Sequence, residues 1–321
     1  MRAQSTLSPA SVGAPLPAPT ATNGTGSGNG TGATGTSNGL DALFPLPNAA
    51  SKWTTFSGAP GALPLSDATL KPAKVEKGMT HNYTMAYGKQ AMEAFYPKGS
   101  YIPSKKPLGG FSFYAPGPDS VNISTASELT FGYSVYFPQG FDFVKGGKLP
   151  GIYGGDSKEN STTCSGGRRD PTCFSARLMW RPEGAGEFYT YLPDSTEGSQ
   201  FAPNEAICKI ANSTCNPTYG ASIGRGAFRF QTGQWTTVTE RVKLNTFGPS
   251  GELQADGALE LFANGESVIN ATNIILRNSP QGRMWGMQMQ TFFGGATSEW
   301  ASPSDQEVYF ADFSVAIIST L

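Results

Sequence analysis

The fold of this chain is constrained most by a series of short β-like runs, in several of which polar and apolar residues alternate. Alternation with a period of two is typical of antiparallel strands that bury one face and expose the other. The runs cover residues 128–137, 173–181, 187–193, 227–231, 235–245, 258–270, 284–295 and 308–318. Many such strands with few helices predict an all-β fold, an antiparallel β-jelly roll (two-sheet sandwich) with a concave substrate-binding face.

Two segments carry more local signals. Asn264-Gly265 lies inside the run 258–270 and predicts a two-residue hairpin turn. The only helix expected is a short one around Tyr87 to Tyr96, and a loop with one helical turn is an equally good interpretation of that segment. Function is expected to reside in the exposed side chains of the concave sheet face.

Composition divides the chain into a tail and one domain. Residues 1–40 are rich in Ser, Thr, Gly, Pro, Ala and Asn, and they predict a disordered, low-complexity linker or tail. Apolar and aromatic residues begin near Asp41, so residues 41–321 are expected to form one β-domain. The 23 Lys+Arg residues nearly balance the 24 Asp+Glu residues, which argues against nucleic acid as a partner. No apolar run approaches the roughly 20 residues that cross a bilayer, so no membrane partner is expected.

Possible glycosylation sites indicate a secreted protein. Asn-X-Ser/Thr acceptors begin at Asn23, Asn29, Asn82, Asn122, Asn160, Asn212 and Asn270. Their density over the whole chain favours an extracellular glycoprotein, and we expect a signal peptide to have been removed before this numbering begins.

Four cysteines bracket two short loops. The expected pairing is between nearest neighbours, Cys164 with Cys173 and Cys208 with Cys215, although three connectivities are possible. Structural disulfides are favoured over a zinc site, because no C-x-x-C pair occurs and the only histidine, His81, lies far away in sequence. No metal or cofactor is expected, and residues 156–159, DSKE, are interpreted as a polar loop rather than a calcium site.

The segment CFSARLMWRPEGAGEFYTYLP, residues 173–193, predicts a hairpin with polar side chains on one face. Strand alternation places Ser175 and Arg177 on the same face of the first strand, and Tyr189 and Tyr191 on the matching face of the second. A turn centred near Gly184 would set Arg177 opposite Tyr191. An ordinary Arg/Tyr ladder on a solvated sheet face is the alternative interpretation of this hairpin taken alone.

A second segment strengthens the functional interpretation. The blocks KLPGIYGG, then the hairpin above, then TFFGGATSEWASPSDQEVYFADFSV resemble the alginate and glucuronan lyases of polysaccharide lyase family 14 over about residues 90–321. The resemblance implies a β-jelly roll that cleaves uronic-acid polymers by β-elimination. It implies five catalytic residues, at Lys148, Ser175, Arg177, Tyr189 and Tyr191. The secreted, glycosylated character suggests a fungal-type member and favours glucuronan over alginate.

The residue types suit that chemistry. Abstraction of the C5 proton places negative charge on the uronate carboxylate, which Arg177 could neutralise with help from a Ser175 hydrogen bond. Lys148 is expected to be the base and Tyr189 or Tyr191 the acid that protonates O4, but the opposite assignment remains open. An arginine nearby would favour both a neutral lysine and a tyrosinate.

Other polar and aromatic positions could line substrate subsites, namely Arg168, Arg169, Arg181, Gln288, Gln290 and Trp300. A purely structural role is as good an interpretation for each. The predicted protein is a monomeric polyuronate lyase acting on an acidic polysaccharide. The alternatives are a lectin-like carbohydrate-binding protein and a glycoside hydrolase, although Glu187 has no obvious second carboxylate for hydrolysis.

Overall fold

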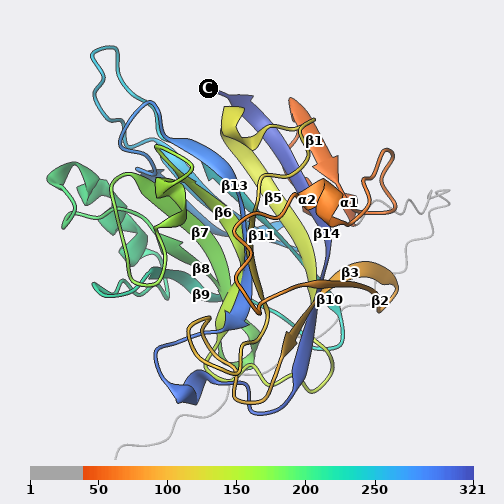
Figure 1. Ribbon diagram of the computed structural model, residues 1–321. Helices are drawn as coiled ribbons and strands as arrows, with labels where there is room; N and C mark the ends of the chain where they lie inside the picture. The colour runs from red at the N-terminus through yellow and green to blue at the C-terminus, as the bar shows by residue number, and fades with distance from the viewer. Residues whose placement is uncertain (1–38) are drawn as a thin grey trace, which may run out of the picture. The chain divides into compact units, whose positions relative to one another are not determined.

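The computed structural model describes residues 39–321, which form two antiparallel β-sheets packed face to face (Figure 1). The larger sheet has eight strands in the order β12-β11-β10-β5-β14-β3-β2, with β1 paired to β14, and the smaller sheet has six in the order β4-β13-β6-β7-β8-β9. Strands distant in sequence are neighbours in both sheets, as in a jelly roll, so the predicted fold class is confirmed. Residues 1–38, which hold most of the predicted tail, lie outside the described residues.

The bounds of the elements are as follows. The larger sheet contains β1 (Ser51–Thr54), β2 (Asn82–Ala86), β3 (Lys89–Tyr96), β5 (Ala126–Tyr136), β10 (Trp235–Lys243), β11 (Gly257–Ala263), β12 (Glu266–Ile274) and β14 (Gln306–Thr320). The smaller sheet contains β4 (Phe111–Ala115), β6 (Gly147–Gly155), β7 (Cys173–Trp180), β8 (Ala185–Tyr191), β9 (Ala221–Arg229) and β13 (Arg283–Phe293). The helices are short: α1 (Leu40–Leu43), α2 (Asp67–Leu70), and the 3-10 helices η1 (Ile123–Thr125), η2 (Asn160–Thr162), η3 (Pro182–Gly184), η4 (Ser199–Lys209) and η5 (Ser298–Trp300). No helix in the described part of the chain is long and apolar enough to cross a membrane.

An apolar, aromatic-rich core lies between the sheets. Tyr96 of the larger sheet and Trp180 of the smaller one meet edge to face, with ring centroids 6.0 Å apart. Strand β7 shows how alternation divides the residues. Phe174, Ala176, Leu178 and Trp180 are buried in this core, so the residues that alternate with them, including Arg177, lie on the outer face of the smaller sheet. That division agrees with the sequence pattern.

The hairpin of β7 and β8 has a different register from the predicted one. Arg177 pairs with Tyr189 rather than Tyr191, and Ser175 pairs with Tyr191. The turn is centred on Glu183, one residue earlier than expected, because Glu183 and Gly184 have φ angles of 58° and 73° within η3. The change shifts the pairing by two residues, so every side chain stays on its predicted face.

The predicted helix around Tyr87 to Tyr96 is wrong, because this segment enters strand β3. Tyr87 and Gly88 have φ angles of 48° and 83°, which are the two left-handed positions of a tight turn from β2 into β3. Within β3, Met92, Ala94 and Tyr96 are buried, a period of two that is typical of a strand, and β3 pairs with β14. The predicted turn at Asn264-Gly265 is confirmed between β11 and β12, with φ angles of 51° and 88°.

Candidate active site

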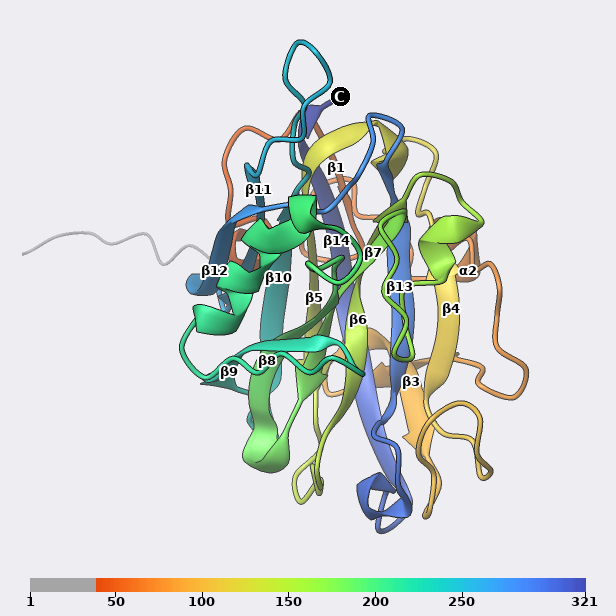
Figure 2. The same ribbon diagram turned by 90° about the vertical axis from the view of Figure 1, so that its left-hand side faces the viewer.

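The outer face of the smaller sheet brings together four side chains from three adjacent strands. Lys148 comes from β6, Arg177 from β7, and Tyr189 and Tyr191 from β8. Figure 2 looks toward this sheet. The four residues line one cavity of about 400 Å³. The sequence predicts exposed side chains on this face, but these residues are largely buried. Arg177 is only 2% exposed and Lys148 only 9%.

Lys148 is a buried amine in a cationic environment. Its Nζ lies 2.9 Å from Sδ of Met179 and 3.8 Å from the centroid of the Tyr189 ring. Burial lowers the pKa of Lys148 well below its usual value; Arg177 and Arg181 lower it further, and Glu187 opposes them. A neutral amine with a free electron pair can accept a proton.

The strand that carries Lys148 is irregular beside it. Pairing of β6 with β7 shifts register between Leu149 and Gly151, where Pro150 cannot donate a ladder hydrogen bond. Two core side chains from the larger sheet bond to this bulge. The Ile152 N–H donates to Oε1 of Glu240 at 2.7 Å, and the Tyr133 hydroxyl donates to the Pro150 carbonyl at 3.1 Å. These bonds hold the backbone of β6 in place beneath Lys148.

Glu240 is itself an unusual core residue. It is 1% exposed, and its Oε2 is buried without a hydrogen-bond partner. Burial raises the pKa of Glu240 well above its ordinary value, although the hydrogen bond from the Ile152 amide opposes the shift. Burial therefore favours the protonated form of this carboxyl in the folded protein.

Arg177 is a buried guanidinium that has no carboxylate partner among residues 39–321. Its Nη1 donates to Oε1 of Gln290 at 2.6 Å, and its Nε is buried without any partner. Gln290 is held in turn, because its Oε1 also accepts from Gln288 and its Nε2 donates to Ser112. An arginine keeps its charge in proteins, so the positive charge of Arg177 is not balanced by an anion at this site.

Tyr189 and Tyr191 lie with their rings nearly perpendicular and their centroids 5.8 Å apart. Burial raises the pKa of Tyr189, the neighbouring Tyr191 raises it further, and the smaller effects of Arg181 and Arg177 do not reverse the shift. Tyr189 is therefore a neutral phenol, and the tyrosinate that the nearby arginine suggested is not favoured here. The hydroxyl oxygen of Tyr191 accepts a hydrogen bond from the Gly167 amide at 3.0 Å.

Two disulfides close the loops beside these residues, in the predicted nearest-neighbour pairing. Cys164 is bonded to Cys173 and Cys208 to Cys215. We call residues 164–173 the first cysteine loop and residues 208–220 the second. Ser165 and Gly166 of the first loop line the cavity. The loop is tied to the sheet by Ser175, whose hydroxyl donates to the Cys164 carbonyl at 2.8 Å.

A second cavity of about 290 Å³ adjoins the first, and Lys148 and Tyr189 line both. Arg181 and Trp300 line this second cavity, at two of the predicted subsite positions. Arg181 is paired with Glu187, whose Oε1 accepts from Arg181 Nε at 2.7 Å. The other oxygen of Glu187 accepts from Arg225 Nε at 2.8 Å. Arg181 thus differs from Arg177, because a carboxylate already balances it.

The remaining candidates are placed differently. Arg169 donates to the carbonyls of Asn216, Pro217 and Tyr219, so its guanidinium joins the two cysteine loops. Arg168 is exposed, and Arg168, Ser175 and Gln288 do not line either cavity.

Sequence reasoning missed some cavity residues. Alternation places Met179 on the outer face of β7 with Arg177, but nothing in the sequence assigns it to the site, and it lines the second cavity. The pairing of Arg181 with Glu187 could have been found in the same way. Tyr219 and the loop residues Ile102 and Gly294 carry no such signal.

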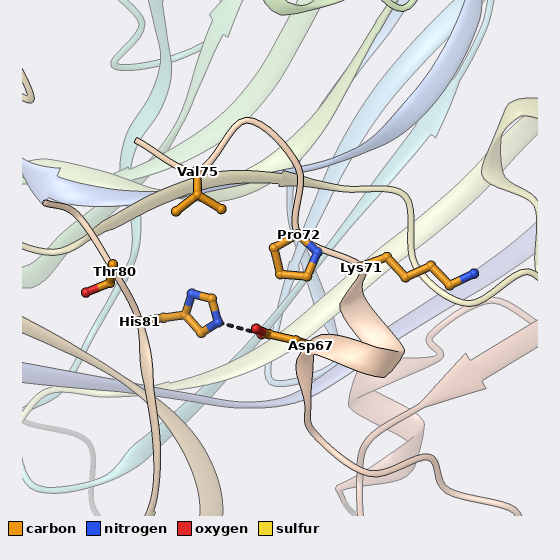
Figure 3. Close-up of a pocket in the computed structure, with 6 residues that line it drawn as sticks. All are labelled: Asp67, Lys71, Pro72, Val75, Thr80 and His81. Carbon is orange, nitrogen blue, oxygen red and sulfur yellow. Dashed lines mark hydrogen bonds and ion pairs between the residues drawn. The ribbon is translucent and has the colours of Figure 1, made fainter. Parts of the chain in front are cut away.

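His81, the only histidine, belongs to a separate cavity of about 570 Å³. Figure 3 shows its ring directed at Asp67, and its Nε2 lies 2.7 Å from Asp67 Oδ1. Tyr83 donates to the same oxygen. Across residues 39–321, no group of three His, Cys, Asp or Glu side chains is arranged to hold a metal ion.

The Polysaccharide lyase 14 family model matches residues 84–313. A PL-14 alginate lyase from Aplysia kurodai is similar in structure, with a TM-score of 0.64 and 33% identity over 74% of this chain and 87% of that one. The alginate lyase vAL-1 from Chlorella virus has a TM-score of 0.65 and 27% identity over 84% of this chain and 100% of that one. No curated protein sequence matches the chain.

Proposed function

This chain belongs to the polysaccharide lyase 14 family, and on that premise we propose that its paired cavities cleave alginate-type polyuronates by β-elimination. The family and its structural relatives make the chain a polysaccharide lyase with an acidic polysaccharide as substrate. The specific polymer, the residue roles and the location of the protein are the parts proposed here.

The observation that carries the proposal is the uncompensated charge of Arg177. A buried guanidinium without a carboxylate beside it is costly, and a bound anion would relieve that cost. The Nε–H group of Arg177 is buried and has no hydrogen-bond partner, so it is free to donate to a ligand. A uronate carboxylate in the first cavity would supply the missing charge and accept from this group.

The reaction then follows from the protonation states. The neutral amine of Lys148 takes the C5 proton of the uronate held by Arg177. The electron pair of the broken C5–H bond then forms the C4=C5 double bond. The bond from C4 to O4 breaks, and the phenol of Tyr189 donates its proton to O4. Return of the proton from Lys148 to Tyr189 restores both groups. Both residues line both cavities, so the scissile bond would lie at their junction.

Ser175 and Tyr191 take supporting roles in this proposal. The Ser175 proton is already donated to the Cys164 carbonyl, so Ser175 would hold the first cysteine loop rather than bond the substrate. Tyr191 accepts a bond from Gly167 and keeps its own proton, which could be donated to the carboxylate at Arg177. Gln290 would orient the guanidinium.

Alginate is proposed ahead of glucuronan because both relatives described above are named as alginate lyases. Secretion and glycosylation are proposed from the two disulfides and from five acceptor asparagines that are all exposed, at Asn82, Asn122, Asn160, Asn212 and Asn270. The protein is also proposed to be a monomer, as expected from the sequence. Asn23 and Asn29 lie outside the described residues. A mobility shift on enzymatic deglycosylation of the secreted protein would test the modification, and gel filtration the monomer.

The test of function is ultraviolet absorbance during incubation with polymannuronate, polyguluronate and glucuronan in turn. Growth of the unsaturated-uronate band on an alginate polymer is expected, with Phe95→Ala, an exposed residue of the other sheet, as the active control. A band with glucuronan alone would transfer the proposal to that polymer. New reducing ends without the band would indicate hydrolysis and refute it, as would the absence of product with all three.

A further inference from the structure

Tyr219 occupies a position that the chemistry above does not use. Its side chain is 44% exposed and lines both cavities, where Lys148 and Tyr189 also meet. Large exposed apolar side chains are few among the described residues. A half-exposed aromatic ring at the junction of two polar cavities offers a flat apolar surface to whatever crosses between them.

The backbone of Tyr219 is held firmly although its ring is free. Arg169 of the first cysteine loop donates to the Tyr219 carbonyl, and also to those of Asn216 at 2.7 Å and Pro217 at 3.1 Å. The Asn216 side chain accepts from the amides of Thr218 and Tyr219 at 2.8 and 3.3 Å. One guanidinium and one amide thus fix the tip of the second cysteine loop.

The same tip rests directly on the catalytic tyrosines. A Cβ at Gly220 would lie 2.9 Å from a ring carbon of Tyr189 and 3.0 Å from one of Tyr191. A Cβ at Gly167 would lie 2.9 Å from the carbonyl oxygen of Thr218, so the two cysteine loops touch each other. Glycine at both positions permits a close approach that any side chain would prevent.

We propose that Tyr219 is a stacking platform for the sugar next to the scissile bond, and that Arg169 is its positioning residue. The inference rests on the proposed function, because it takes a uronate chain as the ligand. A pyranose ring presents axial C–H groups on one face, and these groups can pack against the ring of Tyr219. The carboxylate of the neighbouring uronate would still reach Arg177. The contact adds affinity for the polymer without entering the proton transfers.

Steady-state kinetics on polymannuronate separate the two contributions. Tyr219→Ala should raise KM roughly three- to tenfold with little change in kcat, the effect expected for one lost aromatic contact. Tyr219→Phe keeps the ring and should recover most of that loss. Phe95 has a similarly exposed ring on β3 in the other sheet, at 46%. Phe95→Ala is therefore the matched control, and it should keep the wild-type KM.

Arg169→Ala tests the positioning role. It should raise KM like Tyr219→Ala, and the double variant should be no worse than either single variant, because both remove the same contact. Additive losses, or a fall in kcat with KM unchanged, would overturn the positioning role. An unchanged KM in Tyr219→Ala would overturn the platform while the wild-type product band left the proposed function intact.

Discussion

Replacement of Glu240 by glutamine should stabilise the protein by an amount that grows with pH. In the unfolded chain this carboxyl has a pKa near 4.3 and ionises as the pH rises. In the folded chain burial raises its pKa, so the carboxyl stays protonated to a higher pH than in the unfolded chain. Above the unfolded pKa the unfolded state releases a proton that the folded state retains, so stability falls as pH rises until the folded pKa is reached.

The magnitude follows from linkage. Each pH unit between the two pKa values costs the wild type about 1.4 kcal/mol of unfolding free energy, and Glu240→Gln abolishes that cost. Glutamine keeps the shape and an oxygen that accepts from the Ile152 amide, so the two proteins should be nearly equal at pH 4. For a domain of this size the difference corresponds to a Tm gap that widens by roughly 3 °C per pH unit.

Thermal unfolding of both proteins from pH 4 to pH 8 measures this gap. Glu266→Gln, which removes an exposed carboxyl of β12, controls for the loss of one negative charge. The pH at which the gap stops widening reports the folded pKa of Glu240. A gap that is the same at pH 5 and pH 7 would mean that Glu240 ionises equally in both states, and the reasoning from burial would fail.

Three further predictions concern the active site. Lys148→Ala should lower kcat by about 10²–10⁴-fold, as expected for loss of a base, without lowering Tm. In the wild type, kcat/KM should fall as the pH drops through the lowered pKa of Lys148, because only the neutral amine accepts a proton. Product absorbance measures both, and a profile that stays level into acid would exclude the lysine as base. Arg177→Lys should reduce kcat/KM roughly ten- to a hundredfold, since an ammonium cannot replace the two-armed contact; a near-normal value would show that the fork is not used. Replacing both Cys164 and Cys173 by serine should cost about 3 kcal/mol of unfolding free energy through loop entropy, measured by denaturant unfolding, and unchanged stability would contradict that loop-entropy account.

Much of the fold was predictable because its information is local. Alternation in β7 placed Arg177 outside and Trp180 inside, and this assignment holds even though the hairpin register differs by two residues. The register itself depended on whether Glu183 would adopt a left-handed conformation, which few non-glycine residues do. The segment from Tyr87 to Tyr96, which forms a turn and strand β3, was misjudged for a related reason, because the Tyr87-Gly88 turn lacks the usual Asn-Gly signal.

The surroundings of the active site were less predictable, because they depend on contacts between distant segments. Arg169 looked like a substrate ligand, but it bonds to carbonyl groups 47 to 50 residues away, and carbonyls carry no sequence signature. Likewise, only the assembled sandwich shows that Glu240 reaches across the core to β6. The face on which a strand residue lies can be predicted by counting residues, whereas contacts between loops and between sheets cannot.

The two disulfides span only nine and seven residues of sequence, so each one closes a short local loop and neither joins distant segments of the chain. The proposed reacting groups belong to the strands, whereas part of the cavity wall belongs to the two cysteine loops. Exchanging these loops would therefore reshape the cavities while leaving the strand residues in register. The architecture separates what evolution, or an engineer, must preserve from what can be varied to suit a new polymer.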